Sequence, residues 1–412
     1  MYGYSFLDDC VLLYPVYALL FSDTDLSTTQ ISSLFVIWSL TGILLEVPSG
    51  ALADAVSRRL LLWTGPLLTA TGFALWVLAP SYWTFALGFV LWGAKGAFSS
   101  GALEALVYEE LAHLDAADSY ARVMGRARAA SLAGVMTATA LAGPALAVGG
   151  YGLVGAASVA ACVLTAGVAR GLPEHRGSEG GGGSGGGSGG AGGSGAGGEA
   201  GVGAEAGGEA DGAGWWGALR AGVAEAKGDR AVRGALLLVP AVTAVWGALD
   251  EYTPLLVREA GAGDAAVPWW LLVIWVGATV GSLLAGAVRG VGAGGLAGLL
   301  AGAGLALAAG AALPPHGLPL PAGITLVALA FCAFQLTTVL ADARLQAAVR
   351  GPSRATVTSL AGAATDLTTV AVYGTYGLLV PQTSHGTTFA LLATPYVLTA
   401  LALTLPRNSP RR

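Results

Sequence analysis

Apolar residues along this chain gather into long runs that short polar segments separate. Most runs hold roughly 17 to 25 residues, the length with which an α-helix crosses a hydrocarbon core about 30 Å thick. The pattern therefore predicts an all-α polytopic membrane protein. We expect twelve transmembrane helices, at residues 3–21, 29–50, 60–79, 83–107, 126–148, 151–170, 232–256, 268–288, 292–313, 320–341, 355–380 and 386–405.

A glycine-rich segment divides the twelve runs into two sets of six. Its residues are mostly Gly, with Ser, Ala and acids, and such a chain buries too little apolar surface to fold. The next segment mixes two tryptophans with cationic residues, which is typical of an interfacial helix. The predicted organisation is an N-terminal six-helix half (1–176), a disordered cytoplasmic linker (177–214), a cytoplasmic interfacial helix (215–231) and a C-terminal six-helix half (232–412).

Composition agrees with the pattern and excludes several functions. Only 11% of the residues are charged and 54% are hydrophobic, whereas about a quarter of an average soluble domain is charged. The net charge of -5 arises in the linker, whose acids have no basic counterpart, so it does not indicate nucleic-acid binding. The sequence has no G-x-x-x-x-G-K-[ST] nucleotide motif and no cysteine spacing typical of metal sites. We expect neither an enzyme nor a bound cofactor or metal.

Basic residues near the ends of the runs indicate the orientation. Threading the chain with its N-terminus inside places the Lys and Arg residues on the cytoplasmic side, apart from Lys95 and Arg258. Basic residues favour that side of a membrane. We therefore expect a multi-pass protein of the plasma or inner membrane, with both termini in the cytoplasm.

The loop between the second and third runs, GALADAVSRR, resembles the signature of the major facilitator superfamily. That signature has a glycine, an aspartate four residues later and then a basic pair, and Gly50, Asp54, Arg58 and Arg59 occupy the matching places. Two intervening positions depart from it. The resemblance implies a transporter of two repeated halves with alternating access.

The same resemblance implies a cytoplasmic gate that holds the halves together. Asp54 would face the N-terminal end of the eleventh helix near Arg354, where the helix dipole is positive. Glu46 lies at the end of the second run, and Glu104 shares a helix face with small residues that favour close helix contact. The predicted gate consists of Gly50, Asp54, Arg58, Arg59, Glu46 and Glu104.

A second stretch, AGPALAVGG in the fifth run, resembles the antiporter signature of this superfamily, although four residues instead of two separate its Gly-Pro and Gly-Gly pairs. Pro15 in the first run resembles a proline of drug:proton antiporters. These features point to the multidrug-efflux branch, while Phe89 stands where that branch has an arginine. The antiporter-like residues are Gly143, Pro144, Gly149 and Gly150.

Ionisable side chains within the runs are functional candidates because they are costly in a membrane unless paired, hydrated or protonated. The sequence places no histidine in a run, so proton coupling would fall to carboxylates. The candidates are Asp8, Asp9 and Asp366, with a buried structural network as the alternative for Asp366.

Polar residues at helical spacing predict a central cavity, and the resemblance implies that the first, fourth, seventh and tenth helices line it. Lys95 and Glu104 lie nine positions apart and so on opposite helix faces, which assigns Lys95, with Ser99, to the cavity. Lys95 requires a carboxylate partner, either Asp8 or the substrate. The cavity candidates are Lys95, Ser99, Trp246, Asp250, Gln335 and Thr338; the alternative is that these polar groups form helix-packing hydrogen bonds.

The leading hypothesis is a monomeric, proton-coupled exporter of small amphipathic compounds. Tryptophans in the runs offer aromatic surface for apolar or cationic ligands. One alternative is a proton-coupled symporter that imports a small metabolite; another is a non-transporting membrane sensor or scaffold. The expected partners are a small-molecule substrate, protons and the lipid bilayer, and no nucleic acid.

Overall fold

The structure, a computed structural model, describes a helical protein over most of the chain. It covers residues 1–55, 57–99, 102–174, 229–288, 290–312, 318–349 and 354–404, without the side chains of 46–55, 117, 354 and 355. The predicted linker and nearly all of the predicted interfacial helix lie outside these residues. The last residues assigned to that helix belong instead to the seventh span, whose first helix begins at Arg230.

Each half consists of six spans, several of which are divided into shorter helices. The N-terminal half contains α1 (Tyr2–Asp9), α2 (Tyr17–Asp23), α3 (Thr28–Ala55), α4 (Arg58–Leu78), α5 (Tyr82–Ser99), α6 (Ala102–His113), the short η1 (Ala117–Ser119) and α7 (Tyr120–Arg170). The C-terminal half contains α9 (Arg230–Asp250), α10 (Thr253–Glu259), η2 (Asp264–Ala266), α11 (Val267–Ala287), α12 (Ala293–Ala311), α13 (Leu320–Ala348), α14 (Arg354–Leu379), η3 (Val380–Gln382), α15 (His385–Leu392) and α16 (Thr394–Thr404).

Among the described residues, 8 helical stretches are long and apolar enough to cross a membrane. One of them, α7, has 51 residues and covers the predicted fifth and sixth spans, because the chain reverses at Gly150 with φ 58°. Glycine adopts this backbone conformation without the steric cost that a Cβ would bring. The Gly-Gly pair thus ends the fifth span.

The first span differs from the continuous helix that we predicted. Helix α1 ends at Asp9, and residues 10–16 form turns before α2 begins at Tyr17. Pro15 lacks an N–H and its ring clashes with the carbonyl four residues earlier, so it disfavours a helix here. The buried N–H of Leu13 donates instead to Oγ of Ser158 in α7, at 3.0 Å.

The seventh span is also interrupted, over two residues. Helix α9 ends at Asp250 and α10 begins at Thr253, with Pro254 in its first turn. Proline is well tolerated there because the first N–H groups of a helix have no intrahelical acceptor. The first span of each half is therefore interrupted, near its middle in the N-terminal half and closer to its end in the C-terminal half.

Phe89 lies in a closely packed aromatic core of the N-terminal half. Its side chain is 0% exposed, and its ring centroid lies 4.9 Å from that of Trp76 and 5.7 Å from that of Phe21. An arginine at this position would have to be buried among these rings, so the aromatic packing explains the departure from the drug-exporter pattern.

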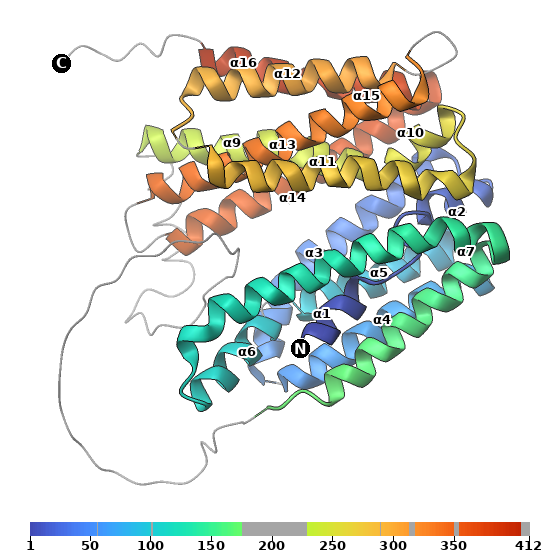
Figure 1. Cartoon of the computed structure of the whole chain (residues 1–412), viewed down its shortest axis with the longest axis vertical. Coiled ribbons are helices and arrows are strands. Elements are labelled where there is room, and N and C mark those ends of the chain that lie inside the picture. The colour runs from blue at the N-terminus through green and yellow to red at the C-terminus, as the bar shows by residue number, and fades with distance from the viewer. Residues whose placement is uncertain are drawn as a thin grey trace.

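The two halves pack along α3 and α14, along α7 and α11, and at α2 and α10 (Figure 1). Oγ1 of Thr29 donates to the carbonyl of Gly377 at 2.6 Å, and the hydroxyls of Ser32 and Tyr252 lie 2.7 Å apart. Arg258 also pairs with Asp23 of the opposite half. We call the end of the bundle that carries this ion pair the Asp23 end; helix α3 separates it from the Arg58 end.

Candidate functional site

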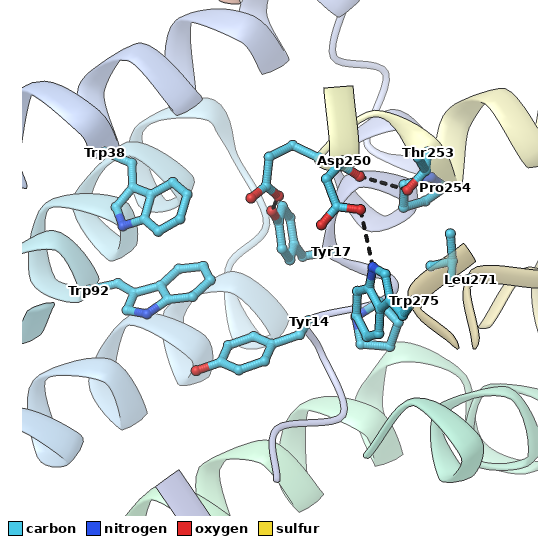
Figure 2. A pocket seen from close by; sticks show the side chains of 11 residues that line it. Tyr14, Tyr17, Trp38, Trp92, Asp250, Thr253, Pro254, Leu271 and Trp275 are labelled. Carbon is cyan, nitrogen blue, oxygen red and sulfur yellow. Dashed lines mark hydrogen bonds between the residues drawn. The ribbon is translucent and has the colours of Figure 1, made fainter. Parts of the chain in front are cut away.

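A pocket of about 180 Å³ lies between the halves, where the first and seventh spans are interrupted (Figure 2). Both interruptions contribute to its wall. It is lined by Tyr14, Pro15, Tyr17, Trp38, Trp92, Asp250, Glu251, Thr253, Pro254, Leu271 and Trp275. A site at the interface of two repeated halves, formed by interrupted helices, is the usual arrangement of a secondary transporter.

The N-terminal half supplies a stack of three aromatic rings. The ring of Trp92 is nearly parallel to that of Tyr14, at 6° and 5.1 Å between centroids, and to that of Trp38, at 24° and 4.8 Å. Figure 2 shows Trp92 between the other two rings. These rings come from the first span, α3 and α5, so the stack forms only when the three spans pack together.

The C-terminal half supplies two carboxylates at the end of α9. Oδ1 of Asp250 accepts a hydrogen bond from Nε1 of Trp275 at 3.1 Å. The hydroxyl of Tyr17 donates to Oε2 of Glu251 and so joins the two halves across the pocket. Asp250 thus accepts from a tryptophan of its own half, and Glu251 accepts from a tyrosine of the opposite half.

Asp250 is the one predicted cavity residue that lines this pocket. Nε1 of Trp246 donates to Oγ1 of Thr338 at 3.2 Å, and Nε2 of Gln335 donates to Oγ of Ser282 at 2.8 Å. Both bonds connect helices within the C-terminal half, as the helix-packing alternative expects. A role of these three residues in substrate binding stays a prediction.

Lys95 has the carboxylate partner that its position requires. Its Nζ lies 2.8 Å from Oδ2 of Asp8, and the two side chains are 13% and 20% exposed. Oγ of Ser99 donates to the backbone carbonyl of Lys95 at 2.7 Å. Asp9 accepts a hydrogen bond from Ser131 in α7. The pair therefore lies within the N-terminal half, beside the interruption of the first span.

Gly65 makes room for the lysine. A Cβ built on Gly65 would lie 3.1 Å from Cγ of Lys95, tighter than ordinary van der Waals contact. The absence of a side chain at Gly65 thus lets the aliphatic part of Lys95 pack closely against α4.

Arg58 and Arg59, two residues of the predicted gate, lie at the Arg58 end and contact their own half. Arg58 pairs with Glu109 of α6, and its backbone N–H donates to Oε1 of Glu174 at 2.9 Å. Nη1 of Arg59 donates to the carbonyl of Leu172 at 3.4 Å. These contacts tie the start of α4 to the end of α7 and to α6.

Of the other predicted gate residues, only Glu104 has a described side chain. Glu104 is exposed on α6. The side chains of Glu46, Asp54 and Arg354, and the surroundings of Gly50, lie outside the described residues. The predicted approach of Asp54 to the eleventh helix therefore stays a prediction.

The antiporter-like residues lie on α7, near the Asp23 end. A Cβ on Gly143 would lie 2.4 Å from the carbonyl oxygen of Ala265, and one on Gly149 would lie 2.5 Å from Cβ of Leu153. Gly143 thus permits the two halves to touch, and Pro144 follows it within the helix. Asp366 is exposed on α14 and is not among the residues that line the pocket.

Sequence reasoning left Tyr14, Tyr17 and Glu251 out of the cavity. A signal was present: each half has a tyrosine and a proline together in its first run, in YPVY at residues 14–17 and in EYTP at 251–254. Interrupted apolar segments at corresponding places in the two halves indicate a transporter binding site. Within the described parts of the chain, no group of three or more His, Cys, Asp or Glu residues could hold a metal.

Comparison with known proteins supports this architecture. The sequence profile of the Major Facilitator Superfamily matches residues 5–373. No curated protein sequence matches this chain.

Three solved structures share the fold over nearly the full length. A variant of the nucleoside transporter NupG is 12% identical with a TM-score of 0.74, covering 98% of this chain and 97% of that one. A bacterial homologue of the human lysosomal transporter Spinster, in an inward-facing and unoccupied conformation, is 16% identical with a TM-score of 0.66, covering 100% and 97%. A D-xylose–proton symporter is 14% identical with a TM-score of 0.62, covering 98% and 95%.

Proposed function

Because this chain belongs to the major facilitator superfamily, we propose that it is a proton-coupled exporter of small amphipathic compounds. The family consists of secondary transporters, so the chain is a multi-pass membrane transporter of a small-molecule substrate and not an enzyme. The observation that supports an amphipathic substrate is the pocket, which joins aromatic rings of one half to two carboxylates of the other. Such a pocket suits a compound with an apolar part and a polar part.

We place the protein in the cell membrane as a monomer, with both termini and the Arg58 end in the cytoplasm. The support is the distribution of Lys and Arg along the sequence. The described bonds between the halves, including Arg258 with Asp23 and Thr29 with Gly377, then lie toward the outside. Alternating access would break these contacts and close the Arg58 end instead.

We propose that Asp54 closes that end by facing the start of α14. Arg58 and Arg59 support this role because their contacts with Glu109 and Glu174 hold the start of α4 on its own half. Asp54 precedes this anchored helix start by four residues in the sequence.

Proton coupling is assigned first to Asp8. Protonation of Asp8 would remove the negative charge that attracts Lys95 at 2.8 Å. Uptake of a proton by Asp8 would therefore break its ion pair with Lys95. Loss of the pair would release a cation beside the interruption of the first span. Asp9 and Asp366 are the further candidates.

The test is a transport measurement in proteoliposomes that contain a pH-sensitive dye. After a proton gradient is imposed, a panel of drugs and metabolites is added, and proton movement and compound movement are both recorded. We expect proton and compound to move in opposite directions. Asp8→Asn should reduce compound-driven proton movement at least tenfold, because asparagine neither takes up a proton nor pairs with Lys95.

Asp118→Asn is the matched control, because it removes the same charge from an exposed site in η1. It should transport normally. Movement of proton and compound in the same direction would identify the symporter instead. Compound transport without any proton movement would contradict the coupling.

A further inference from the structure

We propose that the pocket binds organic cations with a flat apolar part, an inference that rests on the transport function proposed above and names its substrate class. The site would hold the positive group beside Asp250 and Glu251 and the flat part against the rings of Trp38, Trp92 and Tyr14. Charge, ring geometry and the hydrogen bonds already made inside the pocket each support this assignment.

The charge of the pocket wall is negative. The residues that line it include two acids and no basic side chain. Both acids lie at the C-terminal end of α9, where the helix dipole adds partial negative charge. The cation of Lys95 does not offset them, because Asp8 of its own half already pairs with it at 2.8 Å. A positive group would therefore gain from entering the pocket, and an anion would meet two carboxylates.

The aromatic side of the pocket fits a flat, weakly hydrated group. The stacked rings of Tyr14, Trp92 and Trp38 present a wide apolar surface opposite the acids. Because the three rings largely cover one another's faces, this surface supplies apolar contact for the flat part of the ligand, and the two acids attract its positive group. Stacked rings also lose little freedom when a ligand binds, because they already hold one another in place.

The remaining polar groups disfavour other ligands. Apart from Asp250 and Glu251, which already accept from Trp275 and Tyr17, most of the lining residues are aromatic or apolar, so the wall offers few partners for the many hydroxyls of a sugar. A divalent metal ion requires several oxygen ligands with few apolar neighbours, whereas rings and prolines make up much of this wall. An organic cation needs only a nearby carboxylate and an apolar surface.

Binding of three small probes to the purified full-length chain in detergent tests the inference. Isothermal titration calorimetry would compare benzyltrimethylammonium, benzyl alcohol and benzenesulfonate, which share a ring and differ in charge. Small probes are needed because the pocket measures only about 180 Å³. The cation should bind at least tenfold more tightly than either of the others.

Asp250→Asn should weaken binding of the cation about tenfold and leave that of benzyl alcohol unchanged. Glu251→Gln should act in the same direction and serves as the second variant if Asp250→Asn does not fold. Asp118→Asn, which removes a charge from exposed η1, should change nothing. Equal binding of the alcohol or the sulfonate, or no saturable binding of the cation, would overturn the proposal.

Failure of this inference is distinguishable from failure of the proposed function. If proteoliposomes exchange protons for neutral or anionic compounds and reject cations, the exporter stands and the cation class is wrong. If cations bind in the pocket but no compound of any charge crosses the membrane against protons, the exporter is wrong and the cation site stands.

Discussion

The first and seventh spans hold corresponding places in the two halves, and both break at the pocket, but they do so differently. The first span loses its helix over residues 10–16, and a side chain of another helix satisfies the freed N–H of Leu13. The seventh span breaks only between Asp250 and Thr253, where a new helix starts at once. The first break therefore combines the local effect of Pro15 with a tertiary contact, whereas at the second the N–H of Tyr252 donates locally, to the carbonyl of Leu249 at 3.0 Å.

The two breaks also contribute different chemistry. The first supplies Tyr14 and Tyr17, and the seventh supplies Asp250 and Glu251. The bond from Tyr17 to Glu251 joins them. The corresponding breaks of the two halves thus form different sides of the pocket, an aromatic side from the first span and an acidic side from the seventh.

The largest effect on stability is expected from Ser158→Ala. The change removes the hydroxyl that accepts from the buried N–H of Leu13 at 3.0 Å. A buried donor without a partner costs about 1–3 kcal/mol, so the free energy of unfolding should fall by about that amount. Titration with SDS in mixed micelles would measure it.

Thr165→Val is the control for this change. The hydroxyl of Thr165 is also buried in α7 and donates to the carbonyl four residues earlier, at 2.8 Å, as that of Ser158 does at 2.7 Å. The two residues differ in the bond to Leu13. Equal losses of stability in the two variants would show that the first break does not depend on Ser158.

The spans were predictable from sequence because each helix in lipid must satisfy its own backbone hydrogen bonds and so needs a full apolar run. The ninth span, predicted at 292–313, is Ala293–Ala311 in the structure. The pairing of Lys95 with Asp8 was also predictable from sequence, because a buried charge without a partner is costly in a membrane.

The pocket was less predictable. The polar residues of helix α3 do not gather on one face, so periodicity does not tell which face carries Trp38 toward the interior. The N–H freed by the break in the first span donates to Ser158, which lies 145 positions away in the chain. Contacts at such separations follow from how the spans pack, and a single sequence carries little record of them.

A smaller effect is expected from Tyr17→Phe, which removes the bond that joins the two breaks. The ring keeps its place in the aromatic cluster with Phe21 and Phe89, and only the hydroxyl that donates to Glu251 is lost. The free energy of unfolding should fall by about 1.5 kcal/mol, the lower end of the contribution of a hydrogen bond to a charged group.

A double-mutant cycle with Glu251→Gln isolates this bond from other effects. Residues in direct contact show coupling energies of about 0.5–3 kcal/mol, and the two changes should be non-additive by an amount in that range. Additive losses would mean that the aromatic and acidic sides act independently, and the two breaks would then be neighbours without a link.

The smallest effect is expected from Pro254→Ala, because the second break does not depend on a distant partner. Pro254 lies in the first turn of α10, where its missing N–H sacrifices no helical bond. Alanine there should lower the free energy of unfolding by less than about 1 kcal/mol, through greater freedom of the unfolded chain. Pro268→Ala is the matched control, because Pro268 is also buried and also lies in the first turn of a helix, α11, away from either break. If Pro254→Ala destabilises the protein much more than Pro268→Ala does, the proline itself holds the break between Asp250 and Thr253 open, and the seventh span resembles the first in needing a specific device to interrupt it.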